Sequence, residues 1–252
     1  GNAADTIHFS AADTTIGSLR LHFESTPISN DTSKIFYCKL QYAKTTNGGG
    51  AIYILGFSKV VISNNRISNC RTDAYPGGGG ILCSGSSPVI THNTISHNMT
   101  SFGGGGICCE NSSPAITHNI ISNNSAYNGG GGIECFGIYN ASNATITGNI
   151  VSYNTASYGG GISSSNNSPK ILNNFISNNT ASDGGGIYCA NDGTPAIINN
   201  AISNNSATDG GGGICCDYTY GNPSFANNTF SNNSAAKGGG LFCSLYSNMT
   251  LQ

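Results

Sequence analysis

A run of glycines followed by isoleucine, with cysteine two residues after the isoleucine, recurs along most of this chain. The Ile or Leu that follows each run marks one repeat, and successive markers are 25 to 29 residues apart. A fixed phrase that returns at such an interval is typical of a solenoid, in which each repeat forms one coil. The cysteine-containing copies of the phrase lie at 77–83, 103–109, 129–135, 184–189 and 210–216.

The segments between the glycine runs predict short β-strands rather than helices. They read Ser-Pro-x-Ile-x-x-Asn-x-Ile-Ser-x-Asn, so apolar residues lie beside short polar turns without a 3.6-residue period. Three such strands per repeat fit an all-β, right-handed parallel β-helix of about eight coils, each of 25–30 residues. Residues 35–252 are expected to form these coils, the last one incomplete, and residues 1–34 an irregular cap or an atypical first coil.

Each column of the repeat predicts a ladder, because stacked coils place equivalent residues above one another at about 4.8 Å. One column is asparagine, whose amides can hydrogen-bond from coil to coil. Another is cysteine, which we expect to face the core as a small apolar residue beside the marker isoleucine. The asparagine ladder is Asn65, Asn93, Asn119, Asn149, Asn174, Asn200 and Asn228. The cysteine ladder is Cys83, Cys109, Cys135, Cys189, Cys216 and Cys243, with Ser164 in the remaining coil.

Two motifs of the repeat resemble those of a known family. Gly-Gly-Ala-Ile at 49–52 and Phe-Ala-Asn-Asn at 225–228 are similar to the GGA[ILV] and FxxN repeats of polymorphic outer-membrane proteins. More broadly, residues 35–252 resemble the parallel β-helix repeat proteins of microbial surfaces. The resemblance implies a surface-exposed or secreted domain, often an adhesin, in a superfamily that also includes polysaccharide lyases and hydrolases. The chain departs from the family pattern where isoleucine mostly replaces the phenylalanine.

Composition argues against two classes of function. Only 8% of residues are charged, and seven of the nine lysines and arginines precede position 72, so most coils lack a basic stripe for nucleic acid. No apolar run approaches the roughly 18 residues of a membrane-spanning segment. Asn-x-Ser/Thr sequons are compatible with an extracellular protein, and the candidate glycosylation sites are Asn98, Asn111, Asn143, Asn178, Asn204 and Asn248.

Two cysteines differ from the thiols of the ladder. Cys108 and Cys215 directly precede a ladder cysteine, so the alternation of a strand turns them outward. We expect exposed thiols there, available to crosslink a neighbouring subunit. No metal site or cofactor is predicted, since His92 and His118 share a column but lack an evident third ligand. A solvated charge ladder is expected in one corner column, Asp183, Asp209 and Lys237.

The outer faces that the repeat predicts argue against catalysis. Glycoside hydrolysis typically uses two facing carboxylates, whereas the outward columns of the Ser-Pro-x-Ile strand and of the strand after it carry no acid. Aromatic residues are better candidates for binding, because they precede four successive glycine runs and also occur in the lengthened turns at 136–143 and 217–222. The candidate binding residues are Tyr75, Phe102, Tyr127, Tyr158, Phe136, Tyr139, Tyr218 and Tyr220.

These observations predict a non-catalytic structural or adhesive protein, extracellular or on a microbial cell surface. Its expected partners are itself, joined head to tail into a filament, or further coils of a longer chain. Surface glycans and host or cell-surface proteins are further expected partners. The alternative is a polysaccharide lyase, hydrolase or carbohydrate-binding β-helix that uses the aromatic residues.

Overall fold

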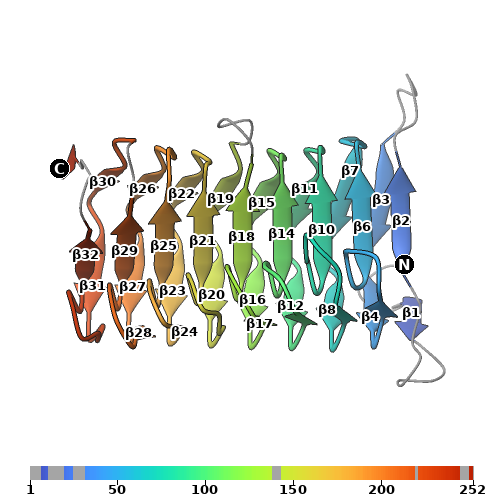
Figure 1. The fold of residues 1–252 in the computed structure, drawn as a ribbon. Coiled ribbons are helices and arrows are strands. Elements are labelled where there is room, and N and C mark those ends of the chain that lie inside the picture. Colours follow the sequence, from blue (N-terminus) through green and yellow to red (C-terminus); the bar gives the residue numbers. More distant parts are fainter. Residues whose placement is uncertain are drawn as a thin grey trace.

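The chain is a stack of parallel coils, as Figure 1 shows. The computed structural model describes residues 7–10, 20–24, 32–137, 143–218, 221–244 and 250–251. Within these residues, three parallel sheets of nine strands each run the length of the stack, one strand from every coil. The prediction of an all-β solenoid of stacked parallel strands is confirmed.

Each coil contributes one strand to sheet B, then one to sheet C, then one to sheet A. Sheet B contains β2 (Leu21–Glu24), β6 (Ile52–Leu55), β10 (Ile81–Ser84), β14 (Ile107–Glu110), β18 (Ile133–Phe136), β21 (Ile162–Ser165), β25 (Ile187–Ala190), β29 (Ile214–Asp217) and β32 (Leu241–Cys243). Sheet C contains β3 (Ser33–Phe36), β7 (Val60–Ser63), β11 (Val89–Thr91), β15 (Ala115–Thr117), β19 (Thr145–Thr147), β22 (Lys170–Leu172), β26 (Ala196–Ile198), β30 (Ser224–Ala226) and β33 (Thr250–Leu251). Sheet A contains β1 (Ile7–Ser10), β4 (Cys38–Gln41), β8 (Arg66–Ser68), β12 (Thr94–Ser96), β16 (Ile120–Ser122), β20 (Ile150–Ser152), β23 (Phe175–Ser177), β27 (Ala201–Ser203) and β31 (Thr229–Ser231).

A fourth, two-residue strand follows the sheet A strand in several coils, before the glycine run. The sequence predicted only three strands per coil, because a two-residue strand leaves no periodic pattern. These short strands are β5 (Lys44–Thr45), β9 (Arg71–Thr72), β13 (Met99–Thr100) and β17 (Ser125–Ala126), with β24 (Thr180–Ala181) and β28 (Ser206–Ala207) further along the stack. The glycine run after them returns the chain to sheet B.

The core consists of aliphatic columns enclosed by the three sheets. In the middle coils, the marker isoleucine of sheet B and the central isoleucines of sheets C and A are fully buried, as Ile107, Ile116 and Ile121 illustrate. Burying such a side chain contributes about 1.5–3 kcal/mol relative to exposing it. Repetition of this contribution in every coil stabilises a chain with few charges.

Asparagine amides hold the corners between the sheets. The residue before each ladder asparagine has a positive φ, for example 55° at His92 and 54° at His118, which turns the chain sharply from sheet C into sheet A. The ladder side chain then satisfies groups at the corner, because Asn93 Nδ2 donates to the backbone oxygen of Ile62 and to Oδ1 of Asn119, at 2.8 and 3.0 Å. The same hydrogen bonds recur from Asn65 to Asn200, and a second ladder lies at the next corner.

The first strands of the chain already belong to the three sheets. β1 pairs with β4, β2 with β6 and β3 with β7, all of them parallel. Segment 1–34 therefore supplies strands to all three sheets, while its division from 35–252 as a separate unit stays a prediction. Among the described residues, no helix is long and apolar enough to cross a membrane.

Candidate functional site

The outer face of sheet B carries acidic and aromatic side chains together. In each strand the first and third residues face the core, so the second and fourth residues are the outward positions. The second-position column includes Tyr53, Leu82, Cys108, Glu134, Ser163, Tyr188 and Cys215. The fourth-position column includes Leu55, Ser84, Glu110, Phe136, Ser165, Ala190 and Asp217.

The glycine corner folds back over the second-position column, whose smaller members are buried: Leu82, Cys108, Ser163 and Cys215. A β-carbon on Gly104 would lie 2.6 Å from the β-carbon of Cys108, and one on Gly211 would lie 2.6 Å from the backbone nitrogen of Cys215. The predicted exposure of these two thiols is therefore wrong, since Cys108 is 0% and Cys215 1% exposed. Burial raises the pKa of both thiols, which makes them unsuited to an intersubunit crosslink.

Glu134 is the most perturbed acid of this face. Its carboxyl lies in front of two glycine corners, because a β-carbon on Gly103 would overlap Oε2 and one on Gly129 would lie 2.6 Å from Oε1. Loss of water around this largely buried group raises its pKa to about 8. No hydrogen-bond donor among the described residues reaches this carboxyl. At neutral pH Glu134 is therefore mainly protonated and can donate its own proton.

Glu110 lies on the neighbouring coil, one outward position further along the strand. Its Oε2 accepts a 2.7 Å hydrogen bond from Ser84 Oγ. The negative charges of Glu110 and Glu134 both raise the pKa of Tyr75, after the larger effect of burial. The hydroxyl of Tyr75 therefore lies within electrostatic reach of both acids. The two glutamates and the tyrosine form one acidic cluster over β14 and β18.

Aromatic rings flank this cluster. The Tyr75 ring meets Phe102 edge-on at 5.7 Å between centroids and lies 6.1 Å from Phe136, so it connects the glycine corner with the fourth-position column. Tyr75 itself is 64% exposed, which leaves much of its surface free to contact a ligand. We call Glu110, Glu134, Tyr75, Phe102 and Phe136 the acidic–aromatic site.

A second group of rings and acids lies further along the same face. Tyr158 packs against Tyr188 at 5.1 Å, and the Tyr188 hydroxyl donates a 3.3 Å hydrogen bond to Asp217 Oδ2. In the corner column, Asp183 Oδ1 accepts a hydrogen bond from the backbone nitrogen of Gly210, and burial raises the pKa of this carboxyl. The exposed pair Asp209 and Lys237 forms a 2.8 Å ion pair. The corner column is thus solvated at Asp209 and Lys237 and partly enclosed at Asp183.

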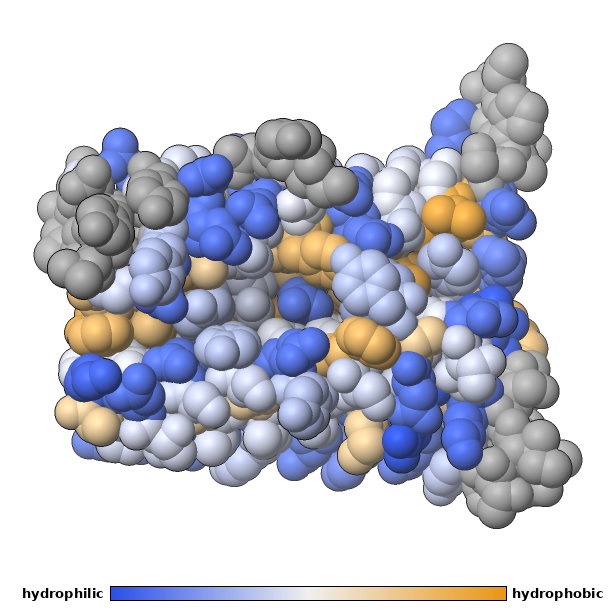
Figure 2. Space-filling view, in the orientation of Figure 1, coloured by the Kyte–Doolittle hydropathy of each residue, from blue (hydrophilic) through white to orange (hydrophobic). Residues whose placement is uncertain are grey.

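The space-filling view shows the shape of the outer face of sheet B. In Figure 2 the surface is hollowed along the strands of sheet B, between the glycine corners and the turns that lead into sheet C. Apolar surface is visible inside the hollow, and hydrophilic side chains stand along its edges. A hollow that runs across successive coils can accommodate an extended polymer rather than only a compact molecule.

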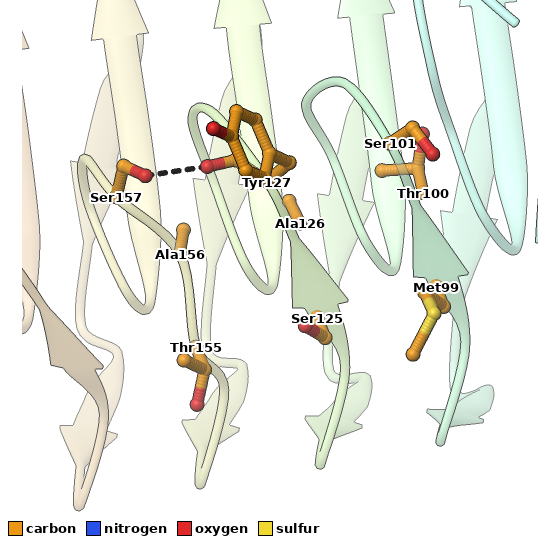
Figure 3. A pocket seen from close by; sticks show the side chains of 9 residues that line it. All are labelled: Met99, Thr100, Ser101, Ser125, Ala126, Tyr127, Thr155, Ala156 and Ser157. Atoms are coloured by element: carbon orange, nitrogen blue, oxygen red, sulfur yellow. Dashed lines mark hydrogen bonds between the residues drawn. The ribbon is translucent and has the colours of Figure 1, made fainter. Parts of the chain in front are cut away.

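Tyr127 lies outside the acidic–aromatic site. The four rings that precede successive glycine runs do not form one continuous strip, because no ring contact joins Tyr127 to Phe102 or to Tyr158 in the described structure. Tyr127 is 74% exposed and borders an open hollow of about 420 Å³ beside β13 and β17, which Figure 3 shows. Small side chains and Met99 line most of this hollow, and Ser157 Oγ donates to the Tyr127 backbone oxygen.

The other predicted ring positions are spread along the chain. Tyr218 is 54% exposed at a left-handed position after β29. Tyr139 and Tyr220 lie outside the described residues, as does the sequon at Asn248.

One predicted glycosylation site is wrong. Asn98 is buried in the second asparagine ladder, where its Nδ2 donates to Ile67 and to Asn124. Of the other sequons, Asn143 and Asn204 are exposed, and Asn111 and Asn178 are partly exposed.

The thiol ladder lies in the core. Cys83, Cys109 and Cys135 occupy paired positions of adjacent strands, and Cys189, Cys216 and Cys243 do so further on. None of the ten cysteines forms a disulfide, and all but Cys243 are buried. His92 and His118 stack their rings at 5.2 Å. No group of three or more potential metal ligands occurs among the residues that the structure describes.

Sequence reasoning missed both glutamates of the acidic–aromatic site. It searched the outward columns of sheets A and C for acids, and the strands of both sheets do lack them. In the strand after the glycine run it assigned outward positions only to Cys108 and Cys215. The same two-residue alternation identifies Glu134 and Glu110 as outward neighbours, because they stand one residue after a marker isoleucine and one after a ladder cysteine.

The chain has recognisable relatives at the level of fold. Residues 22–176 and 132–252 match the family model described as a right handed beta helix region. No curated protein matches the chain in sequence. Among solved structures it is similar to the catalytic domain of Agl-KA, with 15% identity and a TM-score of 0.37 over 100% of this chain and 60% of that one. It is also similar to the A-module of mannuronan C-5 epimerase AlgE6 from Azotobacter vinelandii, with 12% identity and a TM-score of 0.30 over 98% and 88% of the two chains.

The chain thus spans about 60% of the length of the Agl-KA domain. Identities and TM-scores this low transfer neither a residue nor an activity to this chain.

Proposed function

Because the chain belongs to the right-handed β-helix family, whose coils present long flat faces, we propose that it binds a neutral polysaccharide along the outer face of sheet B. The observation that carries this proposal is the acidic–aromatic site, where the exposed ring of Tyr75 stands between Phe102 and Phe136 beside two glutamates. Sugar rings present apolar C–H faces and polar hydroxyl edges, and they therefore require both kinds of group.

Different side chains of the site would contact different parts of the sugar. The rings offer flat apolar surface on which a pyranose can stack. Glu110 can accept hydrogen bonds from sugar hydroxyls, and protonated Glu134 can donate one. Acids without a cationic partner in the site favour a neutral chain over a polyuronate, since like charges repel.

Placement at a microbial surface is part of the proposal. The resemblance of the repeat motifs to polymorphic outer-membrane proteins supports an extracellular or cell-surface location, and glycan binding there would make the protein adhesive. The structural role stays a prediction, as does head-to-tail filament formation, for which light scattering over a range of protein concentrations is the direct measurement.

The test is binding to a panel of neutral and acidic polysaccharides, followed by calorimetry on the best ligand. Tyr75→Ala should weaken binding about tenfold or more, because stacking on an aromatic ring typically contributes about 1–3 kcal/mol. Tyr127→Ala is the matched control, since Tyr127 is also a highly exposed tyrosine but lies at another hollow. The proposal fails if no polysaccharide binds, or if both substitutions weaken binding equally.

Glycoside cleavage at the same site is a second candidate function. It is favoured by one observation, the raised pKa of Glu134 beside a second carboxyl. In such a reaction Glu134 would donate its proton to the glycosidic oxygen as the C–O bond breaks. Glu110 would accept a proton from the attacking water, and the oxygen of that water would form the new bond to the sugar carbon.

An assay for released reducing ends separates the two functions. Cleavage that is abolished by Glu134→Gln, while the variant still binds the polysaccharide, supports catalysis. Undiminished binding of intact polysaccharide with no reducing ends released, over days and across pH 5–8, supports a binding protein alone.

A further inference from the structure

A separate hollow lies on the outer face of sheet A, near the N-terminal end of the stack. It has a volume of about 250 Å³ and is formed by β4, β8 and β12. No acidic residue lines it; the lining residues are Lys39, Gln41, Arg66, Ser68, Asn69, Thr94, Ser96 and His97. We call it the basic hollow.

Two cations stand next to each other in this hollow. Lys39 and Arg66 are register partners in adjacent parallel strands, so their backbones are about 4.8 Å apart and both side chains leave the sheet on its outer side. Like charges directly opposite each other on neighbouring strands are destabilising. An anion between the two charges would remove this repulsion and so stabilise the folded chain.

Neither cation has a partner within the described part of the chain. By contrast, Arg71 is paired with Asp73 at 2.8 Å, and the Arg71 guanidinium lowers the pKa of that carboxyl. Lys237 is paired with Asp209 at the same distance. The uncompensated charge of Lys39 and Arg66 is therefore a local feature of the basic hollow.

The remaining lining residues supply neutral donors. Gln41 Nε2 donates a 3.0 Å hydrogen bond to Ser68 Oγ, which leaves the Ser68 hydroxyl proton free to point into the hollow. Thr94 and Ser96 are the register partners of Arg66 and Ser68 on β12, and they add two hydroxyls. In the next coils the Arg66 column becomes apolar at Ile120 and Ile150, while the neighbouring serine column continues as Ser122 and Ser152.

We propose that the basic hollow binds an oxyanion, with Lys39 and Arg66 neutralising its charge and the hydroxyls completing its coordination. Arginine forms paired hydrogen bonds to the oxygens of sulfate, phosphate or carboxylate, while lysine adds a point charge. The oxyanion is either a free inorganic ion or a charged group carried on a sugar. This inference does not depend on the acidic–aromatic site, which lies on another sheet.

The test is titration of the protein with sodium sulfate and sodium phosphate at constant ionic strength, followed through backbone amide resonances. Saturable shifts are expected at 66–69 and 94–97. Lys39→Gln and Arg66→Gln should each weaken binding about tenfold, which corresponds to one charge-assisted hydrogen bond. Lys39→Arg should retain most of the affinity. Lys170→Gln, which removes one exposed positive charge on sheet C, is the matched control and should leave binding unchanged.

Two further titrations, with charged sugars, identify the source of the anion. Tighter binding of glucose 6-sulfate or galacturonic acid than of the inorganic ions points to a charged glycan, and the reverse order points to a free ion. The proposal is overturned if sulfate, phosphate and both sugars shift the resonances no more than chloride does. It is also overturned if the Lys39→Gln/Arg66→Gln double variant, folded by circular dichroism, binds as well as the unsubstituted protein.

Discussion

The carboxyl of Glu134 occupies the space in front of Gly103 that a β-carbon at Gly103 would fill. The nearest atoms to such a β-carbon all belong to the Glu134 side chain, so substitution there would displace a flexible carboxyl rather than backbone. The absence of a side chain in the glycine corner thus has two consequences. It lets the corner close over sheet B, and it leaves room for an acid without a hydrogen-bond partner.

Gly103→Ala should therefore impair the site more than the fold. We expect polysaccharide binding to weaken about tenfold, because Glu134 is pushed out of place, with the free energy of unfolding changed by less than about 1 kcal/mol. Calorimetry and urea unfolding measure the two effects. Gly104→Ala is the contrasting variant, since φ is +68° at Gly104 and a β-carbon would lie 2.5 Å from the Ile107 oxygen. It should lower stability by several kcal/mol; equal stability of the two variants would refute this account of the corner.

The raised pKa of Glu134 predicts a dependence of stability on pH. Its pKa rises from an ordinary value of 4.5 to about 8 in the folded chain, so between these values the folded state holds a proton that the unfolded state has lost. Stability from this group is therefore fully present below about pH 4.5 and is lost as pH rises to about 8. The loss is at most about 5 kcal/mol and is reduced by the water that still reaches this largely buried carboxyl.

Glu134→Gln should remove this dependence. Urea unfolding at pH 5, 7 and 9 is expected to show similar stability for the variant and the unsubstituted protein at pH 5, and a more stable variant at pH 9. Glu110→Gln is the control at the neighbouring acid. If the stability of Glu134→Gln still falls between pH 5 and pH 9 as steeply as that of the unsubstituted protein, another group causes the pH dependence.

The sequence predicts the fold well because every coil repeats the same local chemistry. Ile107, Cys109 and Asn119 recur at fixed offsets, and a stack of coils is the arrangement that buries the first two and pairs the third. No long-range information is needed to place them, since each residue contacts its equivalents in the adjacent coils.

The candidate site was harder to predict because it depends on how the corners fold. Strand alternation correctly turns Cys108 away from the core, yet it does not show that Gly104 closes over that side. The same closure withdraws Glu134 from water and so changes its protonation. Asn98 illustrates a second limit of sequence reasoning, because this residue belongs both to a sequon and to an asparagine ladder. Its burial in the ladder is seen only in the packed structure.

Burial of the extra thiols is testable by alkylation. In the native protein Cys108 and Cys215 should react with iodoacetamide at least a hundredfold more slowly than an exposed thiol, because they are buried and their pKa values are raised. Tyr127→Cys supplies the exposed reference at a position that is 74% open. Peptide mass spectrometry before and after denaturation gives the modified fraction at each site. Rapid native labelling of Cys108 would mean that the glycine corner opens readily.

The asparagine ladder predicts a large cost for one central substitution. Asn119 Nδ2 donates to the Ile90 oxygen and to Asn149, while its Oδ1 accepts from the backbone nitrogen and the side chain of Asn93. Asn119→Ala leaves these buried groups without partners, and each such loss costs about 1–3 kcal/mol. We expect the free energy of unfolding to fall by about 3 kcal/mol or more, measured by urea denaturation.

Asn128→Ala is the matched control for the ladder. Asn128 is exposed and has neither a side-chain hydrogen bond in the described structure nor a positive φ, so its loss should change stability by less than about 0.5 kcal/mol. If the two variants unfold at the same urea concentration, the ladder amides contribute no net stability. In that case the aliphatic columns alone would have to hold the coils together. A loss confined to Asn119→Ala would instead assign the stability of the corner to its amide hydrogen bonds.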